Sequence, residues 1–85
     1  MVQIILPSIL AAQAGGQKRF ELEAATVGEA LRALPVADLL FDERSELRPL
    51  VNVYVDGRDA RWDGGLECSL EDARELRVVG AVAGG

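Results

Sequence analysis

The stretch Val51-Asn52-Val53-Tyr54-Val55-Asp56-Gly57 carries the strongest structural signal in this sequence. Its three valines alternate with Asn and Tyr, which is the pattern of a strand with one buried face. The Asp-Gly pair that follows predicts a tight hairpin turn. We expect Ala60-Arg61-Trp62 to return as the paired strand, so that an antiparallel hairpin organises the second half of the chain.

Two further strands are predicted near the start of the chain. Residues 2–6 alternate and end at Pro7, which cannot donate a hydrogen bond within a central ladder. Residues 18–23 alternate between charged and apolar positions, and a loop over residues 11–16 separates the two segments. We expect the two strands to form a hairpin.

Thr26-Val27-Gly28-Glu29 has the form of a capping box at the start of a helix. The apolar residues that follow the 3.6-residue period of a helix form one buried stripe, and they are Val27, Ala30, Leu31 and Leu34. Pro35 interrupts the helix, and residues 36–41 are expected to form a second, shorter one. The charged residues 42–49 then form a loop.

The last strand is predicted over residues 75–79, after a turn or single helical turn at residues 69–72. One helix packed on a mixed sheet of four or five strands is the simplest two-layer solution for this order of elements. This is an α+β arrangement, the β-grasp, in which the first and last strands pair in parallel at the centre of the sheet. We therefore expect a β-grasp domain at residues 1–79 and a flexible tail at residues 80–85.

The composition excludes several classes of protein. The 85 residues include no histidine and one cysteine, so a Ser-His-Asp or Cys-His catalytic pair, a zinc site and a disulfide framework are all excluded. Fourteen acids against nine scattered bases give a net charge of −5, which argues against nucleic-acid binding. With no targeting signal and no apolar span, we expect a soluble cytoplasmic protein that binds no metal, nucleic acid or membrane.

Six of the nine glycines form three Gly-Gly pairs. Gly15-Gly16 and Gly64-Gly65 lie between structured segments, where we expect turns that need positive φ. Gly84-Gly85 is different, because it follows a tail that buries little. Two residues without Cβ can pass through a narrow slot and bring a terminal carboxylate to an activating enzyme. A β-grasp body with such a tail is the ubiquitin-like arrangement.

The whole chain resembles the ubiquitin-like sulfur carriers of the ThiS/MoaD superfamily, and within it the CysO-type branch. Four segments carry the resemblance: Ala14-Gly15-Gly16-Gln17-Lys18, Val51-Asn52-Val53-Tyr54-Val55, Asp59-Ala60-Arg61-Trp62-Asp63-Gly64-Gly65-Leu66 and Ala81-Val82-Ala83-Gly84-Gly85. The resemblance implies a carrier that catalyses nothing and serves as a co-substrate. It implies that the Gly85 carboxylate is adenylated and converted to a thiocarboxylate that donates sulfur.

The resemblance also implies the partners. A ubiquitin-activating-like adenylyl- and sulfurtransferase would use ATP and Mg²⁺, while the carrier itself binds no cofactor. The partner active sites would receive the tail residues Ala81, Val82, Ala83 and Gly84. The sulfur acceptor would be cysteine-synthase-like or thiosugar- or thiazole-synthase-like, in the biosynthesis of cysteine or another sulfur-containing metabolite. A metallopeptidase would then release the product.

Three apolar residues are expected on the sheet face away from the helix. If the residues that alternate with them face the helix, then Ile5, Tyr54 and Val79 form a patch where a partner can dock beside the tail. The competing expectation is that loop residues or Trp62 cover these positions. Cys68 is read as structural, since no cationic neighbour is evident and Glu67 and Glu71 raise its pKa.

Other functions remain open at this point. The chain is alternatively the small subunit of molybdopterin synthase, or a protein modifier in which Gly85 forms an isopeptide bond with lysines. The remaining alternative is a β-grasp interaction domain whose terminal glycines have no chemical role.

Overall fold

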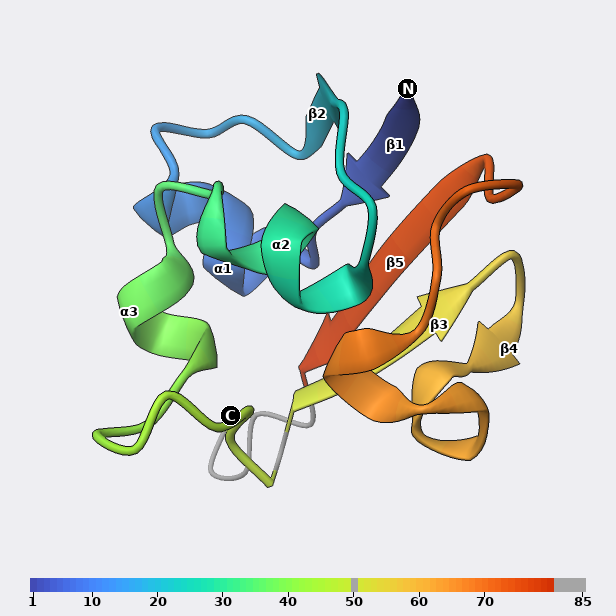
Figure 1. The fold of residues 1–85 in the computed structure, drawn as a ribbon. Coiled ribbons are helices and arrows are strands. Elements are labelled where there is room, and N and C mark those ends of the chain that lie inside the picture. Colours follow the sequence, from blue (N-terminus) through green and yellow to red (C-terminus); the bar gives the residue numbers. More distant parts are fainter. Residues whose placement is uncertain (50, 81–85) are drawn as a thin grey trace.

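The computed structural model describes residues 1–49 and 51–80 of the chain (Figure 1). In chain order the elements are β1 (Val2–Ile5), α1 (Ser8–Gln13), β2 (Arg19–Leu22), α2 (Val27–Arg32), α3 (Ala37–Leu40), β3 (Val51–Val55), β4 (Arg58–Asp59), the 3-10 turns η1 (Ala60–Asp63) and η2 (Gly65–Glu67), and β5 (Glu75–Gly80). None of the helices described is long and apolar enough to cross a bilayer.

The strands form one mixed sheet in the order β2-β1-β5-β3-β4. β1 and β5 are parallel, with Gln3 opposite Glu75, while the other neighbouring strands are antiparallel. The predicted β-grasp arrangement is therefore confirmed, including the parallel pairing of the first and last strands at the centre. β5 runs one residue past Val79, where the sequence pattern ended this strand.

The core lies between one face of the sheet and the three helices, which lie together on that side (Figure 1). The inward residues of the strands alternate as predicted, and Ile4 and Leu76 at the sheet centre are completely buried. From the helices, Ala11 of α1, Leu31 of α2 and Leu40 of α3 complete the core. The other sheet face carries no helix among the described residues, and we call it the open face.

The start of α2 follows from its cap. The Glu29 backbone N–H donates to the Thr26 side-chain oxygen at 3.2 Å, which satisfies one of the free donors of the first turn. The stripe predicted from the sequence is buried, including Leu34 just beyond the helix. A short second helix follows the proline, as predicted, although α3 covers only Ala37–Leu40.

Two local predictions were wrong. Residues 11–16 are not simply a loop, because α1 occupies Ser8–Gln13 and buries Ala11 against the core. Residues 60–62 are not a return strand, since β4 is only Arg58–Asp59. The Asp59 carboxylate accepts the backbone N–H of Arg61 at 2.9 Å and so starts the 3-10 turn η1 instead.

Candidate functional site

β5 fixes the point from which the predicted tail departs. It is the middle strand of five, and its last residue, Gly80, lies opposite Val51 of β3. β1 accompanies β5 only as far as Arg77, which faces Ile5, whereas β3 accompanies it to Gly80. We call Gly80 the tail root. Among the described strands, the last residues of β5 are therefore paired on the β3 side alone.

The predicted reactive residue Gly85 and the tail residues Ala81, Val82, Ala83 and Gly84 lie outside the described residues. The structure describes the end of β5 at Gly80, which these residues follow in the sequence, and the open face that β5 crosses.

The open face is ordered in three rows across the sheet. The row farthest from the tail root contains Glu21, Gln3 and Glu75, which follow one another across β2, β1 and β5. The middle row contains Arg19, Ile5, Arg77, Tyr54 and Asp59. The row nearest the root contains Val79 and Asn52.

The three predicted docking residues share the open face, but they do not form a continuous apolar surface. Ile5 of β1 and Tyr54 of β3 lie on either side of Arg77. Val79 is the next residue of β5 after Arg77 that lies on the same face of the sheet. Ile5 and Tyr54 are half-buried, while Val79 is 38% exposed. Arg77 therefore separates the three apolar residues. We call Ile5, Tyr54 and Val79, which surround the Arg77 guanidinium on three sides, the apolar ring.

Trp62 does not cover this patch. Its side chain is 85% exposed, which makes it the most exposed large apolar residue described. Its neighbour Arg61 reaches the open face instead and donates a side-chain hydrogen bond to the Asn52 side-chain oxygen. The sequence reasoning missed Arg61 and Arg77. The alternation of β5 placed Arg77 outward, but nothing in the sequence indicated that η1 folds back onto Asn52.

Cys68 is buried, with 8% of its surface exposed. Burial raises the pKa of its thiol, the Asp63 carboxylate raises the pKa further, and the Arg58 guanidinium opposes them. The predicted direction is confirmed, but its cause is burial and Asp63 rather than Glu67 and Glu71. Arg58 is a cationic neighbour of Cys68 that was not predicted. Its guanidinium forms an ion pair with the Asp63 carboxylate at 2.8 Å. A buried thiol with a raised pKa is a poor nucleophile.

Two of the glycine pairs are structural, as predicted. Gly15 and Gly16 have φ of 73° and 87°, and Gly64 and Gly65 have φ of 101° and 62°. A residue with a Cβ is strained in this left-handed region.

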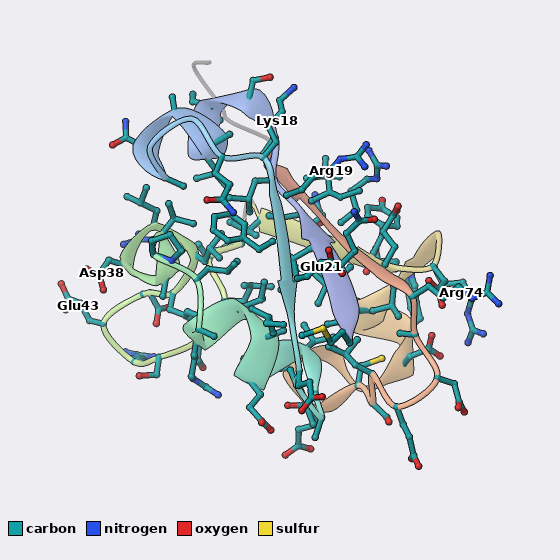
Figure 2. The ribbon with its side chains drawn as sticks, turned by 90° about the horizontal axis from the view of Figure 1, so that it is seen from above. Lys18, Arg19, Glu21, Asp38, Glu43 and Arg74 are labelled. Carbon is teal, nitrogen blue, oxygen red and sulfur yellow. The ribbon has the colours of Figure 1, made fainter. Side chains whose placement is uncertain are left out.

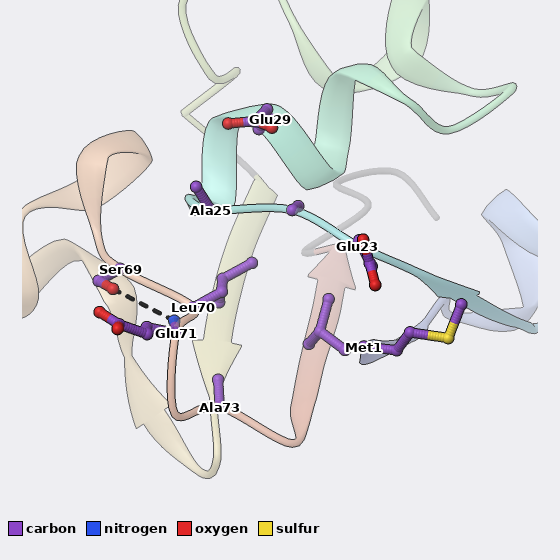
Figure 3. Close-up of a pocket in the computed structure, with 10 residues that line it drawn as sticks. Met1, Glu23, Ala25, Glu29, Ser69, Leu70, Glu71 and Ala73 are labelled. Carbon is purple, nitrogen blue, oxygen red and sulfur yellow. Dashed lines mark hydrogen bonds between the residues drawn. The ribbon is translucent and has the colours of Figure 1, made fainter.

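A depression of about 590 Å³ lies at the end of the sheet remote from the tail root (Figure 3). Glu23, Glu29 and Glu71 are among the residues that line it, and the Glu71 backbone N–H donates to the Ser69 hydroxyl at 3.2 Å. Within residues 1–49 and 51–80, no group of three or more His, Cys, Asp or Glu side chains is arranged to hold a metal ion. The depression gives the remote end of the molecule an acidic surface.

Comparison with known proteins identifies similar chains of full length. The model of the ThiS family matches residues 4–85. The sulfur carrier protein CysO of Mycobacterium tuberculosis is 33% identical over 91 aligned residues, which cover 99% of this chain and 98% of CysO. The crystal structure of CysO from that organism has a TM-score of 0.84 at 30% identity, covering 96% of this chain and 100% of its own.

Two further solved structures are similar over nearly the whole chain. The crystal structure of the Amycolatopsis orientalis BexX/CysO complex contains a chain with a TM-score of 0.83 and 34% identity, and both chains are covered completely. The small archaeal modifier protein 1 of Methanosarcina acetivorans has a TM-score of 0.80 at 28% identity, covering 99% of this chain and 95% of its own.

Proposed function

Because the chain belongs to the ThiS family of sulfur carriers, we propose that the carboxylate of Gly85 is the group that carries the sulfur. A protein of this kind is a co-substrate of enzymes and does not itself catalyse a reaction. The proposal divides the chain into a β-grasp domain at residues 1–79 and a C-terminal tail at residues 80–85. Gly80 is then the residue where strand pairing and tail meet.

The chemistry requires activation of the carboxylate, which is by itself a poor electrophile. A carboxylate oxygen of Gly85 attacks the α-phosphorus of ATP, and pyrophosphate leaves, with Mg²⁺ held by the activating enzyme. Sulfide then attacks the acyl carbon of the adenylate and AMP leaves, which gives the thiocarboxylate. If a persulfide is the donor, an acyl disulfide forms first and a thiol reduces it. The thiocarboxylate is ionised at neutral pH and is a good nucleophile.

The observation that carries this proposal is that the likeness to the family is continuous through residue 85. The ThiS family match ends at Gly85, and the CysO alignment covers 99% of the chain. Cys68 is a poor alternative site for the sulfur, because only 8% of its surface is exposed, and this also favours Gly85. Ala81, Val82, Ala83 and Gly84 would then be the residues that enter the active sites of partner enzymes.

The partners follow from the CysO likeness. A ubiquitin-activating-like adenylyl- and sulfurtransferase loads the carrier, and a cysteine-synthase-like or thiosugar- or thiazole-synthase-like enzyme accepts the sulfur. The Amycolatopsis orientalis CysO in complex with BexX supports a carrier that docks on a separate protein. The product is cysteine or another sulfur-containing metabolite, which a metallopeptidase releases where it stays attached to the carrier. This chemistry belongs in the cytoplasm, where ATP is available.

Docking is assigned to the open face around Ile5, Tyr54 and Val79. All three lie on the sheet face without helices, and Val79 is one residue from the tail root. A partner that covers them excludes water from apolar surface and at the same time meets the start of the tail.

Intact-mass measurement tests the proposed function. The chain is incubated with ATP, Mg²⁺, a sulfur source and the purified activating enzyme from the same genome. The expected result is a mass increase equal to the exchange of one oxygen for one sulfur, and its loss when Gly85 is deleted. A Cys68→Ala variant is the matched control and should still gain the sulfur. No mass change with any cognate activating enzyme, or a change that persists without Gly85, would refute the proposal.

A second function is favoured by one specific observation. The likeness to small archaeal modifier protein 1, at a TM-score of 0.80, allows a protein modifier whose Gly85 forms an isopeptide bond with lysines of other proteins. Proteomic detection of lysine adducts that carry residues 78–85, the remnant left by tryptic cleavage after Arg77, would support this function if they are absent in cells that express the Gly85 deletion.

A further inference from the structure

Charge on the open face is divided between its two halves. The half near the tail root consists of the middle row, which contains Arg19 and Arg77, and of the row nearest the root. In that last row the Arg61 side chain binds Asn52. The half away from the root carries Glu21 and Glu75. Arg19 and Glu21 both lie on the sheet side of the molecule, whereas Asp38 and Glu43 lie on the helical side (Figure 2).

The arginines of the root half are only partly neutralised by described residues. The Arg77 Nε lies 3.3 Å from the Glu75 carboxylate, yet the Arg77 side chain remains 52% exposed. Arg61 is bound to a neutral amide oxygen, that of Asn52. The middle row also contains one carboxylate, that of Asp59, which accepts the Arg61 backbone N–H at the start of η1 and keeps its charge, so the root half has three arginines against one carboxylate.

The opposite end of the molecule is acidic. Glu23, Glu29 and Glu71 line the depression beside the start of β5, five residues and about 16 Å along the strand from the tail root. The whole chain has a charge of −5. The root half of the open face, with three arginines against the one carboxylate of Asp59, is therefore more positive than the remote end, where glutamates outnumber Arg74.

We propose, on the basis of the sulfur-carrier function above, that Arg19, Arg61 and Arg77 dock on carboxylates that flank the tail-entry slot of the activating enzyme. A partner surface that is acidic at its slot attracts the root half of the open face. It repels the end lined by glutamates, so that encounters in the wrong orientation are suppressed. The charges thus orient the carrier so that the tail meets the slot.

The apolar ring and the arginines act together in this complex. Ile5, Tyr54 and Val79 supply the contact that excludes water, and Arg77 at their centre supplies a charge that a buried partner carboxylate can meet. Aromatic residues and arginine are the residue types that most often dominate the affinity of protein interfaces. A partner without a carboxylate at this position would cover the Arg77 guanidinium with only the Glu75 carboxylate, 3.3 Å from its Nε, to offset the loss of water, which is costly.

Direct binding tests the proposal without any chemistry. The wild-type chain and the variants Arg19→Glu and Arg77→Glu are titrated with the activating enzyme from the same genome in the absence of ATP, by calorimetry. Arg74→Glu is the matched control, since it makes the same charge change at an exposed residue just before β5, away from the root. We expect Kd to rise about tenfold for Arg19→Glu and Arg77→Glu at low salt, and less than about twofold for Arg74→Glu.

Ionic strength gives a second readout. The wild-type Kd should rise steeply between about 0.05 and about 0.5 M NaCl, and the slope should be smaller for Arg77→Glu, because surface charges are screened over a few ångströms at high salt. Thermal unfolding followed by circular dichroism establishes that each variant is folded. If Arg77→Glu does not fold, Arg77→Gln removes the charge with little change in length and should still weaken binding.

Four results would overturn the proposal. They are undetectable binding of the wild-type chain at low salt, an unchanged Kd for folded Arg77 variants, an equal loss of affinity in Arg74→Glu, and dimerisation of the free chain through Arg77, which would assign this face to a second copy.

The sulfur-carrier function is judged separately, from the intact mass. A wild-type chain that binds through Arg77 but gains no sulfur refutes the function, whereas one that gains sulfur while Arg77→Glu binds normally refutes only the docking.

Discussion

Arg77 lies directly opposite Tyr54 in the antiparallel pair of β3 and β5, with Ile5 on its other side. The central strand of the sheet therefore presents the Arg77 guanidinium between two apolar side chains. Val79 is the next residue of this strand on the same face. A partner that binds here must combine an apolar surface with a negative charge.

Tyr54→Glu should weaken binding to the activating enzyme while the domain stays folded. The new carboxylate replaces a half-buried ring on the open face and pairs with Arg77, which removes the apolar contact and reduces the positive charge that Arg77 presents to a partner. We expect about a tenfold rise in Kd and a change in stability of less than about 1 kcal/mol. Calorimetric titration and urea unfolding measure the two effects. Tyr54→Phe is the control, and an unchanged Kd for Tyr54→Glu would count against the docking surface.

Gly84→Ala should slow the formation of the thiocarboxylate. A methyl group at this position would clash in a slot that admits only main chain, and one misplaced methyl group typically costs about tenfold or more in such a pocket. The rate of the mass change, followed by intact-mass spectrometry, measures the effect. Ala83→Gly shortens a side chain nearby and should stay within about twofold of the wild-type rate. Equal rates for Gly84→Ala and wild type would exclude a steric role for Gly84.

Leu76→Ala should destabilise the domain strongly. Leu76 is completely buried in the central strand, opposite Ile4 on one side and Val55 on the other. Loss of its side chain should lower the free energy of unfolding by about 2–5 kcal/mol. Urea denaturation measures this, and Val79→Ala on the open face of the same strand should cost less than about 1 kcal/mol. Similar losses for the two variants would mean that both faces of β5 are packed.

Asp56→Ala should loosen the start of β5. The Asp56 carboxylate accepts the backbone N–H of Glu75 at 2.9 Å and of Arg74 at 3.2 Å, and so joins the β3–β4 turn to the last strand. Hydrogen bonds to a charged group are worth about 1.5–3 kcal/mol, so we expect a loss of that order on chemical denaturation. Asp56→Asn keeps an acceptor and tolerates the left-handed φ of 49° at this position, so its loss should be smaller. An Asn variant as unstable as the Ala variant would contradict this role.

Cys68 should be unreactive in the folded protein. Burial and the Asp63 carboxylate raise the pKa of its thiol, so labelling by iodoacetamide should be far slower in buffer than in urea, as measured by intact mass. The same shift predicts a pH effect. Below the ordinary thiol pKa the folded and the unfolded chain both keep the proton. Above it the unfolded chain loses the proton first, so stability falls as pH rises. Cys68→Ala should lack this alkaline loss, and fast labelling of the folded chain would refute the assignment.

The regular parts of the fold were predictable from local pattern. Residues 51–55 and 75–79 alternate so clearly that the sequence alone indicates both their strands and their buried faces. The capping box at Thr26 was sufficient to place the start of α2. The parallel pairing at the sheet centre followed from the order of the elements.

The parts that failed depend on contacts between distant residues. A helix as short as α1 is marginal by itself and exists because Ala11 packs into the core, which no local pattern reveals. The turn η1 replaces the expected strand because Asp59 caps it, and only then can Arg61 reach Asn52. Ile5, Tyr54 and Val79 were thus predicted on the correct face of the sheet, but the arginines around them were not foreseen.

The pairing of Gln3 with Glu75 joins the first and the last strand described at the middle of the sheet. During synthesis, β1 is made before the other strands described and β5 after them, so the sheet cannot be completed until β5 has been made. Folding that depends on such distant contacts is slow. A chain broken before Glu75 would leave β1 and β3 with unpaired edges and an uncovered core, which favours aggregation and proteolysis. Survival of the folded domain in the cell therefore reports that the polypeptide is intact at least as far as β5, the strand that ends at Gly80.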